Sequence, residues 1–162
     1  MRVGNGFDVH PFDDPSSARR LVLGGVEIAD TPPLAGHSDA DVLTHAVVDS
    51  LLGARGWGDI GERFGVDSPE TAGASSIAFV AAVIADLHDD GWRVGNLDAT
   101  VIAQRPRLSG ARDDIRARLA DVLGVDIDDV GVKFTTTDRL GAIGRGEGIA
   151  AWVTCMLTTV RR

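Results

Sequence analysis

The strongest structural signal in the chain is the segment SDADVLTHAVVDSLLGARG, residues 38–56. Its apolar residues recur every three or four positions between Asp39 and Ala54, which is the spacing of an amphipathic α-helix. Ser38 is a residue type that caps helix N-termini, and Gly56 suits the left-handed conformation that ends many helices. We therefore predict a helix over Asp39–Ala54 with one face in the core.

The segments around this helix alternate between strands and helices. Strand-forming residues predict a first strand over Arg2–Val9 and a tight β-hairpin over Leu21–Ile28. Helical spacing and glycine stops predict two more helices, about Ser76–Asp90 and Ala111–Leu123. β-Branched residues predict three later strands, which are Arg93–Gln104, Val130–Thr136 and Ile149–Val160. These elements predict a single domain over residues 1–162, of α/β (α+β) class, with a mixed, mainly four-stranded sheet covered by helices.

The chain is acidic, with 24 Asp and Glu residues against 16 Lys and Arg residues and a net charge of -8. This charge disfavours nucleic acid and anionic membranes as partners, so an anionic ligand must be bound by local features such as metals or helix N-termini. The single cysteine, Cys155, excludes an intramolecular disulfide and fits a small buried residue. Because the sequence also shows no signal-peptide pattern and no apolar run of membrane-spanning length, we expect a cytoplasmic protein.

The first candidate ligands are Asp8 and His10, which flank Val9 near the end of the first predicted strand. Side chains alternate along a strand, so the carboxylate and the imidazole point to one face and Val9 to the other. Gly4 and Gly6 upstream allow another element to pack closely. Taken alone, the pair indicates little, because an Asp and a His two residues apart are common by chance.

A second cluster, GHSDAD at residues 36–41, opens the predicted central helix, and His45 follows one turn after Asp41. A metal-bound imidazole usually has its other nitrogen held by an acceptor, which Asp49 one turn on or Asp41 one turn back could supply. His37, at the helix N-terminus, is a candidate anion contact. The plain alternative places both histidines in solvent.

Asp8, His10 and His45 together form a two-His, one-carboxylate set. Such a set leaves a coordination position open on zinc, and it also suits non-haem iron. The sequence therefore predicts a metal site whose metal the ligand types alone leave open.

Three later clusters carry polar groups in loops. GDIG at residues 58–61 ends the loop after the central helix, and TTTD at residues 135–138 follows a predicted strand. Hydroxyls and a carboxylate at a strand end suit phosphate oxygens and a hard cation such as magnesium. The glycines of GRGEG, residues 144–148, indicate a tight loop. Each cluster also has a structural interpretation, as a turn, a strand end or a solvated Arg–Glu pair.

The order of these clusters resembles that of the 2-C-methyl-D-erythritol 2,4-cyclodiphosphate synthase family over essentially the whole chain. The matching stretches are Gly4–His10, Gly36–Asp49, Gly58–Gly61, Asn96–Arg107 and Lys133–Ala150. The resemblance implies a cyclising phosphorus–oxygen lyase of the non-mevalonate isoprenoid pathway. Its substrate would be 4-diphosphocytidyl-2-C-methyl-D-erythritol 2-phosphate, and its products the 2,4-cyclodiphosphate and CMP. The family also implies a homotrimer whose active sites lie between subunits, with zinc ligands from one and much of the cytidine pocket from its neighbour.

The resemblance also implies a role for each matched position. It assigns zinc to Asp8, His10 and His45, the first two also facing the substrate, and magnesium or manganese to Asp138, where the family usually has Glu. It assigns His37 and Thr136 to catalysis. The further substrate contacts that it implies are Ser38 for the phosphates, Asp59, Ile60 and Gly61 for the methylerythritol hydroxyls, Phe64 and Asp67 in the following loop, Ala103, Arg107, Thr135, Thr136 and Thr137 for the nucleotide, and Arg145.

Three departures from the family pattern and two rival functions stand beside this prediction. FGVDSP, residues 64–69, replaces a common Phe-Pro-x-x-Asp-Pro run, and Ala74-Ser75-Ser76 replaces a common Ala-Asp-Ser, in a loop that contacts substrate in the family. Ala142 stands where a Phe often lines the central cavity of the trimer. The rivals are a zinc hydrolase, whose product would be linear, and a non-enzymatic trimeric module that binds metals or isoprenoid diphosphates. A cyclic product formed together with CMP excludes both.

Overall fold

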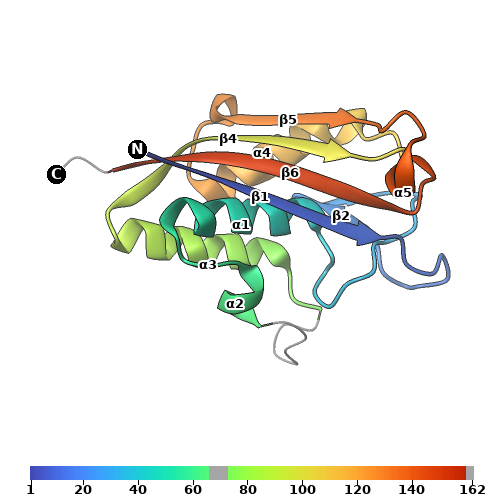
Figure 1. Ribbon diagram of the computed structural model, residues 1–162, viewed down its shortest axis with the longest axis horizontal. Helices are drawn as coiled ribbons and strands as arrows, with labels where there is room; N and C mark the ends of the chain where they lie inside the picture. The colour runs from blue at the N-terminus through green and yellow to red at the C-terminus, as the bar shows by residue number, and fades with distance from the viewer. Residues whose placement is uncertain (66–72, 160–162) are drawn as a thin grey trace.

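The computed structural model describes residues 1–65 and 73–159, which form a sheet covered by helices (Figure 1). The strands are β1 (Arg2–Pro11), β2 (Leu21–Leu23), β3 (Val26–Ile28), β4 (Trp92–Ile102), β5 (Val130–Thr135) and β6 (Gly148–Thr159). The α-helices are α1 (Val42–Arg55), α2 (Ile60–Phe64), α3 (Ser76–Asp89), α4 (Arg112–Leu123) and α5 (Gly141–Gly144). Two 3-10 turns, η2 (Ser109–Ala111) and η3 (Ile127–Asp129), lie on either side of α4.

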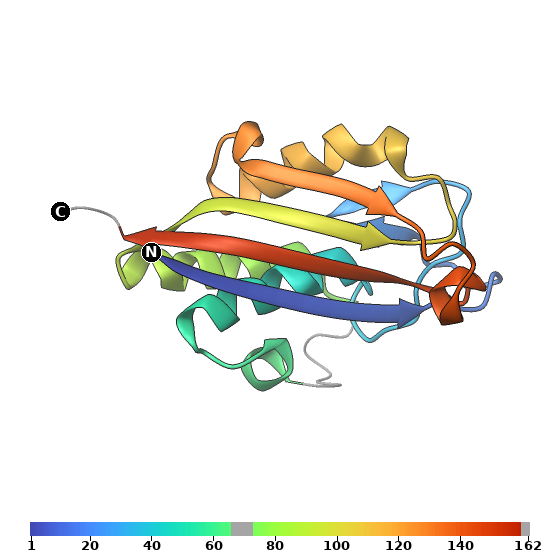
Figure 2. The same cartoon turned by 45° about the horizontal axis from the view of Figure 1, so that its top comes forward.

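The main sheet is mixed and four-stranded, with the order β1-β6-β4-β5 (Figure 2). β6 runs antiparallel to both of its neighbours, β1 and β4, whereas β5 runs parallel to β4. β2 pairs with β3 in a separate two-stranded sheet. The predicted mixed α/β sheet is therefore confirmed. Strands β1 and β5 form its two edges, roughly 14 Å apart at the usual strand spacing.

One face of the sheet carries the helices and the core. α1 packs on β1 and β6, α3 packs beside α1 and against β4, and α4 packs on β5. Two glycines of β1 bring α1 very close, because a Cβ on Gly4 would lie 2.1 Å from the Ser50 carbonyl oxygen and one on Gly6 would lie 2.1 Å from that of Ala46. The close packing expected from these glycines is present, and it sets α1 directly against the strand that carries Asp8 and His10.

The opposite face of the sheet exposes large apolar side chains. Phe7 and Trp152 stand opposite each other on β1 and β6, with their rings edge to face at 6.0 Å between centroids. Both are more than half exposed, as is Val3, and Val9 is 50% exposed. The Phe7 and Trp152 rings therefore form an exposed apolar contact, and large exposed apolar patches are typical of interaction surfaces.

The start of the central helix differs from the prediction. α1 begins at Val42, and its N-cap is Asp41 rather than Ser38, because the Asp41 carboxylate accepts the Thr44 N–H at 3.0 Å. The preceding Ala40 has φ of +56°, a left-handed conformation that keeps Ser38 out of the helix. Gly56 ends the helix in the left-handed conformation, as predicted.

Two short helices, α2 and α5, were not predicted from the sequence. They lie in segments where the sequence predicts loops. They are five and four residues long, which is too short to show a helical period. No helix within the described residues is long and apolar enough to cross a membrane.

Candidate functional site

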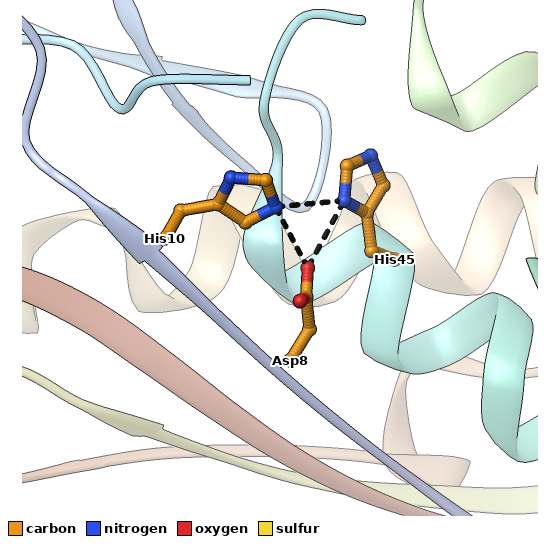
Figure 3. Close-up of side chains that lie close together, drawn as sticks. All are labelled: Asp8, His10 and His45. Carbon is orange, nitrogen blue, oxygen red and sulfur yellow. Dashed lines mark hydrogen bonds and ion pairs between the residues drawn. The ribbon is translucent and has the colours of Figure 1, made fainter. Parts of the chain in front are cut away.

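Three side chains converge on one point beside α1 (Figure 3). Asp8 and His10 come from β1, with Val9 turned to the opposite face, and His45 comes from α1. Asp8 Oδ2 lies 2.9 Å from His10 Nε2 and 3.0 Å from His45 Nδ1, and the two ring nitrogens lie 3.2 Å apart. Donors bound at about 2 Å to a tetrahedral zinc lie roughly 3.3 Å from one another, so this set fits a small divalent metal. The predicted grouping of these residues is confirmed.

The remaining nitrogen of His10 faces a backbone acceptor. Its Nδ1 lies 2.6 Å from the Ala35 carbonyl oxygen, to which it donates. A proton on Nδ1 leaves the lone pair of a neutral ring on Nε2, the nitrogen that faces Asp8 and His45. The loop before α1 therefore fixes the orientation of this candidate ligand.

The partners of His45 differ from the prediction. Its Nε2 lies 3.0 Å from Ser38 Oγ and 2.9 Å from Ser76 Oγ, not beside Asp41 or Asp49. Asp41 is fully buried and accepts backbone N–H groups from the hairpin and from α1. Asp49 accepts the Ile60 N–H at 2.8 Å and so holds the start of α2. The two carboxylates one turn away are thus occupied with backbone donors.

Burial and neighbouring charges shape the ionisation of the site. Burial alone raises the pKa of Asp8, but hydrogen bonds from His10 and His45 outweigh it and hold that pKa well below its usual range. Burial lowers the pKa of His10, yet hydrogen bonds to Asp8 and Ala35 outweigh it and raise that pKa above the ordinary imidazole value. Burial also raises the pKa of Asp49, in spite of its bond from Ile60. At neutral pH the site therefore presents an ionised Asp8 carboxylate to a cation.

We expect the stabilisation of this protein by a divalent metal to shrink as the pH falls from about 8 to about 6. The pKa of His10 is raised in the metal-free protein, so its protonated ring contributes stability below the ordinary imidazole pKa that is lost as the pH rises through the raised value. The metal requires the deprotonated ring. Lowering the pH thus favours the metal-free state and opposes the metal-bound one. Melting curves with zinc and with a chelator at each pH measure the difference, and a pH-independent difference would contradict the ligand role of His10.

A cavity of about 390 Å³ opens on these three side chains. Of the positions implied for substrate binding, those that line it are Asp8, His10, His37, Ser38, Ile60, Gly61 and Phe64. Asp59 does not line the cavity. It lies next to Ile60 in the chain, where its carboxylate accepts the Glu62 N–H and caps α2. Phe79 of α3 also lines the cavity and stacks on Phe64 with 4.6 Å between ring centroids. Phe79 was not predicted as a site residue, because its sequence context shows only another apolar residue of a helix. Asp67 lies outside the described residues.

A second cavity, of about 320 Å³, opens at the other edge of the sheet where β5 ends. The implied nucleotide contacts that line it are Ala103, Arg107, Thr135 and Thr136. Asp138 lies next to it, with its carboxylate accepting a hydrogen bond from the Thr136 hydroxyl at 3.2 Å. The two cavities share no lining residue. Within one chain, the predicted site is thus divided into two separate halves.

The remaining predicted positions lie at the edges of this arrangement. The Thr137 hydroxyl donates to the Leu140 carbonyl oxygen at 2.7 Å, a bond that closes the turn before α5. Arg145 forms an exposed ion pair with Glu147 at 2.5 Å, so the structural interpretation of that cluster fits this chain. Cys155 is buried, with its thiol 3.2 Å from the Ser50 carbonyl oxygen, and burial raises the pKa of that thiol.

The fold and the site define an α/β protein with a donor set for a divalent metal at the floor of a cavity. A family model described as the YgbB family matches residues 1–158. The 2-C-methyl-D-erythritol 2,4-cyclodiphosphate synthase of Thiobacillus denitrificans is 52% identical over 157 residues, which are 97% of this chain and 96% of the relative. The synthase of Thermosynechococcus vestitus is 48% identical with the same coverage of both chains.

A solved structure described as IspF from Plasmodium falciparum in complex with CDP has a TM-score of 0.86 at 33% identity. The match covers 99% of this chain and 97% of that one. The chain therefore belongs to the YgbB family, whose curated relatives are 2-C-methyl-D-erythritol 2,4-cyclodiphosphate synthases. The predicted family is confirmed, and with it the prediction of an enzyme of the cyclising lyase class.

Proposed function

We propose that this protein converts 4-diphosphocytidyl-2-C-methyl-D-erythritol 2-phosphate to 2-C-methyl-D-erythritol 2,4-cyclodiphosphate with release of CMP, in the non-mevalonate isoprenoid pathway and in the cytoplasm. The observation that carries the proposal is the convergence of Asp8, His10 and His45 on one cavity of a chain this similar to synthases of that name. The CDP bound to the Plasmodium falciparum relative supports a cytidine diphosphate as the ligand.

The chemistry requires positioned charges rather than a general base. The 2-phosphate of the substrate is an anion at neutral pH and can attack the β-phosphorus directly. A phosphorus–oxygen bond forms in the new ring, the bond from the β-phosphorus to CMP breaks, and the leaving CMP takes the electron pair. Holding both groups in line makes the closure an intramolecular step.

The residues of the first cavity would orient the reacting phosphates. Asp8, His10 and His45 would hold zinc, which supplies Lewis-acid stabilisation of charge on the β-phosphate. His37 and Ser38 line the same cavity and would contact the phosphate oxygens. Asp59, Ile60 and Gly61, at the start of α2, would bind the methylerythritol hydroxyls.

The residues of the second cavity would hold the nucleotide. Arg107 places a positive charge beside Ala103 and the threonines that end β5. The Thr136 hydroxyl would stabilise charge that develops on the phosphates in the transition state. Asp138, which follows it, would hold magnesium or manganese.

A homotrimer would bring the two halves of the site together. The two cavities lie at opposite edges of the sheet. A substrate that contacts both would therefore bind between the first cavity of one subunit and the second cavity of its neighbour. The apolar sheet face around Phe7 and Trp152 supports such an assembly, because an exposed patch of this kind is buried when subunits associate.

The direct test is to incubate the protein with the substrate, zinc and magnesium, and to follow CMP release together with the phosphorus spectrum. We expect CMP and a cyclic diphosphate in equal amounts, and loss of both when a chelator is added. A linear phosphorylated product would indicate the hydrolase instead. No turnover by a metal-loaded trimer would favour the binding module.

A further inference from the structure

We propose that Ser76, backed by Asp39, is a positioning residue for the candidate metal ligand His45. The three side chains form a relay in which His45 Nε2 donates to the Ser76 hydroxyl and that hydroxyl donates to the Asp39 carboxylate. The relay rests on the proposed function in one respect, which is that a metal binds at Asp8, His10 and His45. It gives Ser76 and Asp39 a role toward the metal ligand that the resemblance does not assign to them.

The direction of the relay follows from which nitrogen of His45 faces the metal site. Nδ1 points to Asp8 Oδ2 at 3.0 Å and to His10 Nε2 at 3.2 Å, so Nδ1 is the nitrogen that would bind the metal (Figure 3). A neutral imidazole that binds through Nδ1 carries its proton on Nε2. His45 Nε2 is therefore a donor and needs an acceptor.

Asp39 fixes the Ser76 hydroxyl as that acceptor. An ionised carboxylate only accepts hydrogen bonds. Asp39 Oδ2 accepts the Ser76 backbone N–H at 2.9 Å, and Oδ1 accepts the Ser76 hydroxyl proton. With its proton committed to Asp39, Ser76 Oγ turns a lone pair to His45 Nε2, 2.9 Å away. Each bond of such a chain polarises the next.

Ser38 carries the other hydroxyl near His45, but unlike Ser76 it lines the first cavity. Ser38 Oγ lies 3.0 Å from His45 Nε2 and 3.2 Å from Ser76 Oγ, and Ser38 lines the first cavity. Its hydroxyl can thus turn toward a bound phosphate. Ser76 is fully buried and does not line the cavity. Ser76 can influence the reaction only through His45, whereas Ser38 can contact the substrate.

The relay joins segments that are distant in sequence. Asp39 lies in the loop before α1, His45 in the first turns of α1, and Ser76 is the first residue of α3. The start of α3 therefore sets the rotation of the His45 ring. Groups that hold the second nitrogen of a metal-bound histidine typically change metal affinity about 10- to 100-fold when removed.

The test compares Ser76→Ala with Ser75→Ala, a matched control at the exposed neighbouring serine, which makes no side-chain cap hydrogen bond. Zinc affinity is measured by competition with a chromogenic chelator, and the visible spectrum of the cobalt-substituted protein reports the geometry of the ligands. We expect Ser76→Ala to bind zinc about 10- to 100-fold more weakly with an altered cobalt spectrum. Ser75→Ala should match the wild type in both measurements.

A second variant keeps the test decisive if Ser76→Ala folds poorly. Asp39→Asn has the same shape but presents an amide NH2 to one of the two Ser76 donors, so it should weaken zinc binding in the same direction. Melting of the metal-free proteins separates a loss of stability from a loss of metal affinity. Wild-type zinc affinity in both folded variants would overturn the relay alone. A wild-type protein that binds no zinc would overturn the metal site of the proposed function, and the relay with it.

Discussion

His45→Ala is expected to lower the rate of CMP release about a thousandfold, because one missing ligand opens the metal site and removes its charge stabilisation. His45 supplies the donor from α1, and Asp8 and His10 alone would leave a two-residue site on a single strand. The loss should lie in kcat as well as in kcat/KM, since the interaction serves the transition state. The measurement is CMP release at saturating substrate, with zinc content determined on the same samples.

The matched control for this prediction is His88→Ala. His88 is exposed near the end of α3 and lies away from both cavities. It should keep both its zinc content and its rate. If His45→Ala released CMP at the wild-type rate, the three converging side chains would not be the reaction centre, and the resemblance would have carried the wrong roles to these positions.

The parts of the fold that the sequence predicted well are those with a long period. The central helix and the two helices after it were located to within a few residues, since each shows several helical repeats and a glycine stop. The predicted start of α1 was wrong, because a contact with a distant segment decides whether Ser38 or Asp41 caps the helix. Asp41 accepts N–H groups of Gly24 and Gly25 from the β2–β3 turn, and that contact holds its carboxylate over the helix.

The site shows the same division between local and distant information. Alternation along β1 placed Asp8 and His10 on one face, and the helix placed His45 nearby. The partners of His45 could not be predicted, because Ser76 reaches it from α3, 31 residues along the chain. The only local signal for Ser76 was its place at the start of a helix. A serine at that place is equally well explained as a helix cap. Its hydroxyl acquires a second role only when α3 packs beside α1.

If the site is divided between subunits as proposed, two inactive variants should restore each other's activity. His45→Ala damages the first cavity, and Asp138→Asn damages the second while keeping a residue type that tolerates the left-handed conformation at this position, where φ is +51°. In a trimer that contains both variants, one of the three sites pairs an intact first cavity with an intact second cavity. Random mixing at equal amounts makes about three quarters of the trimers mixed, so about a quarter of wild-type activity should return.

The experiment unfolds and refolds the two variants together, and purifies mixed trimers through a different tag on each variant. Each variant refolded alone is the control, and both should stay nearly inactive, because every site then lacks the same half. Recovery in the mixture requires that the first cavity of one chain works with the second cavity of another. If purified mixed trimers released CMP no faster than the single variants, the substrate would have to span both edges of one sheet, and the separation of the two cavities would need another explanation.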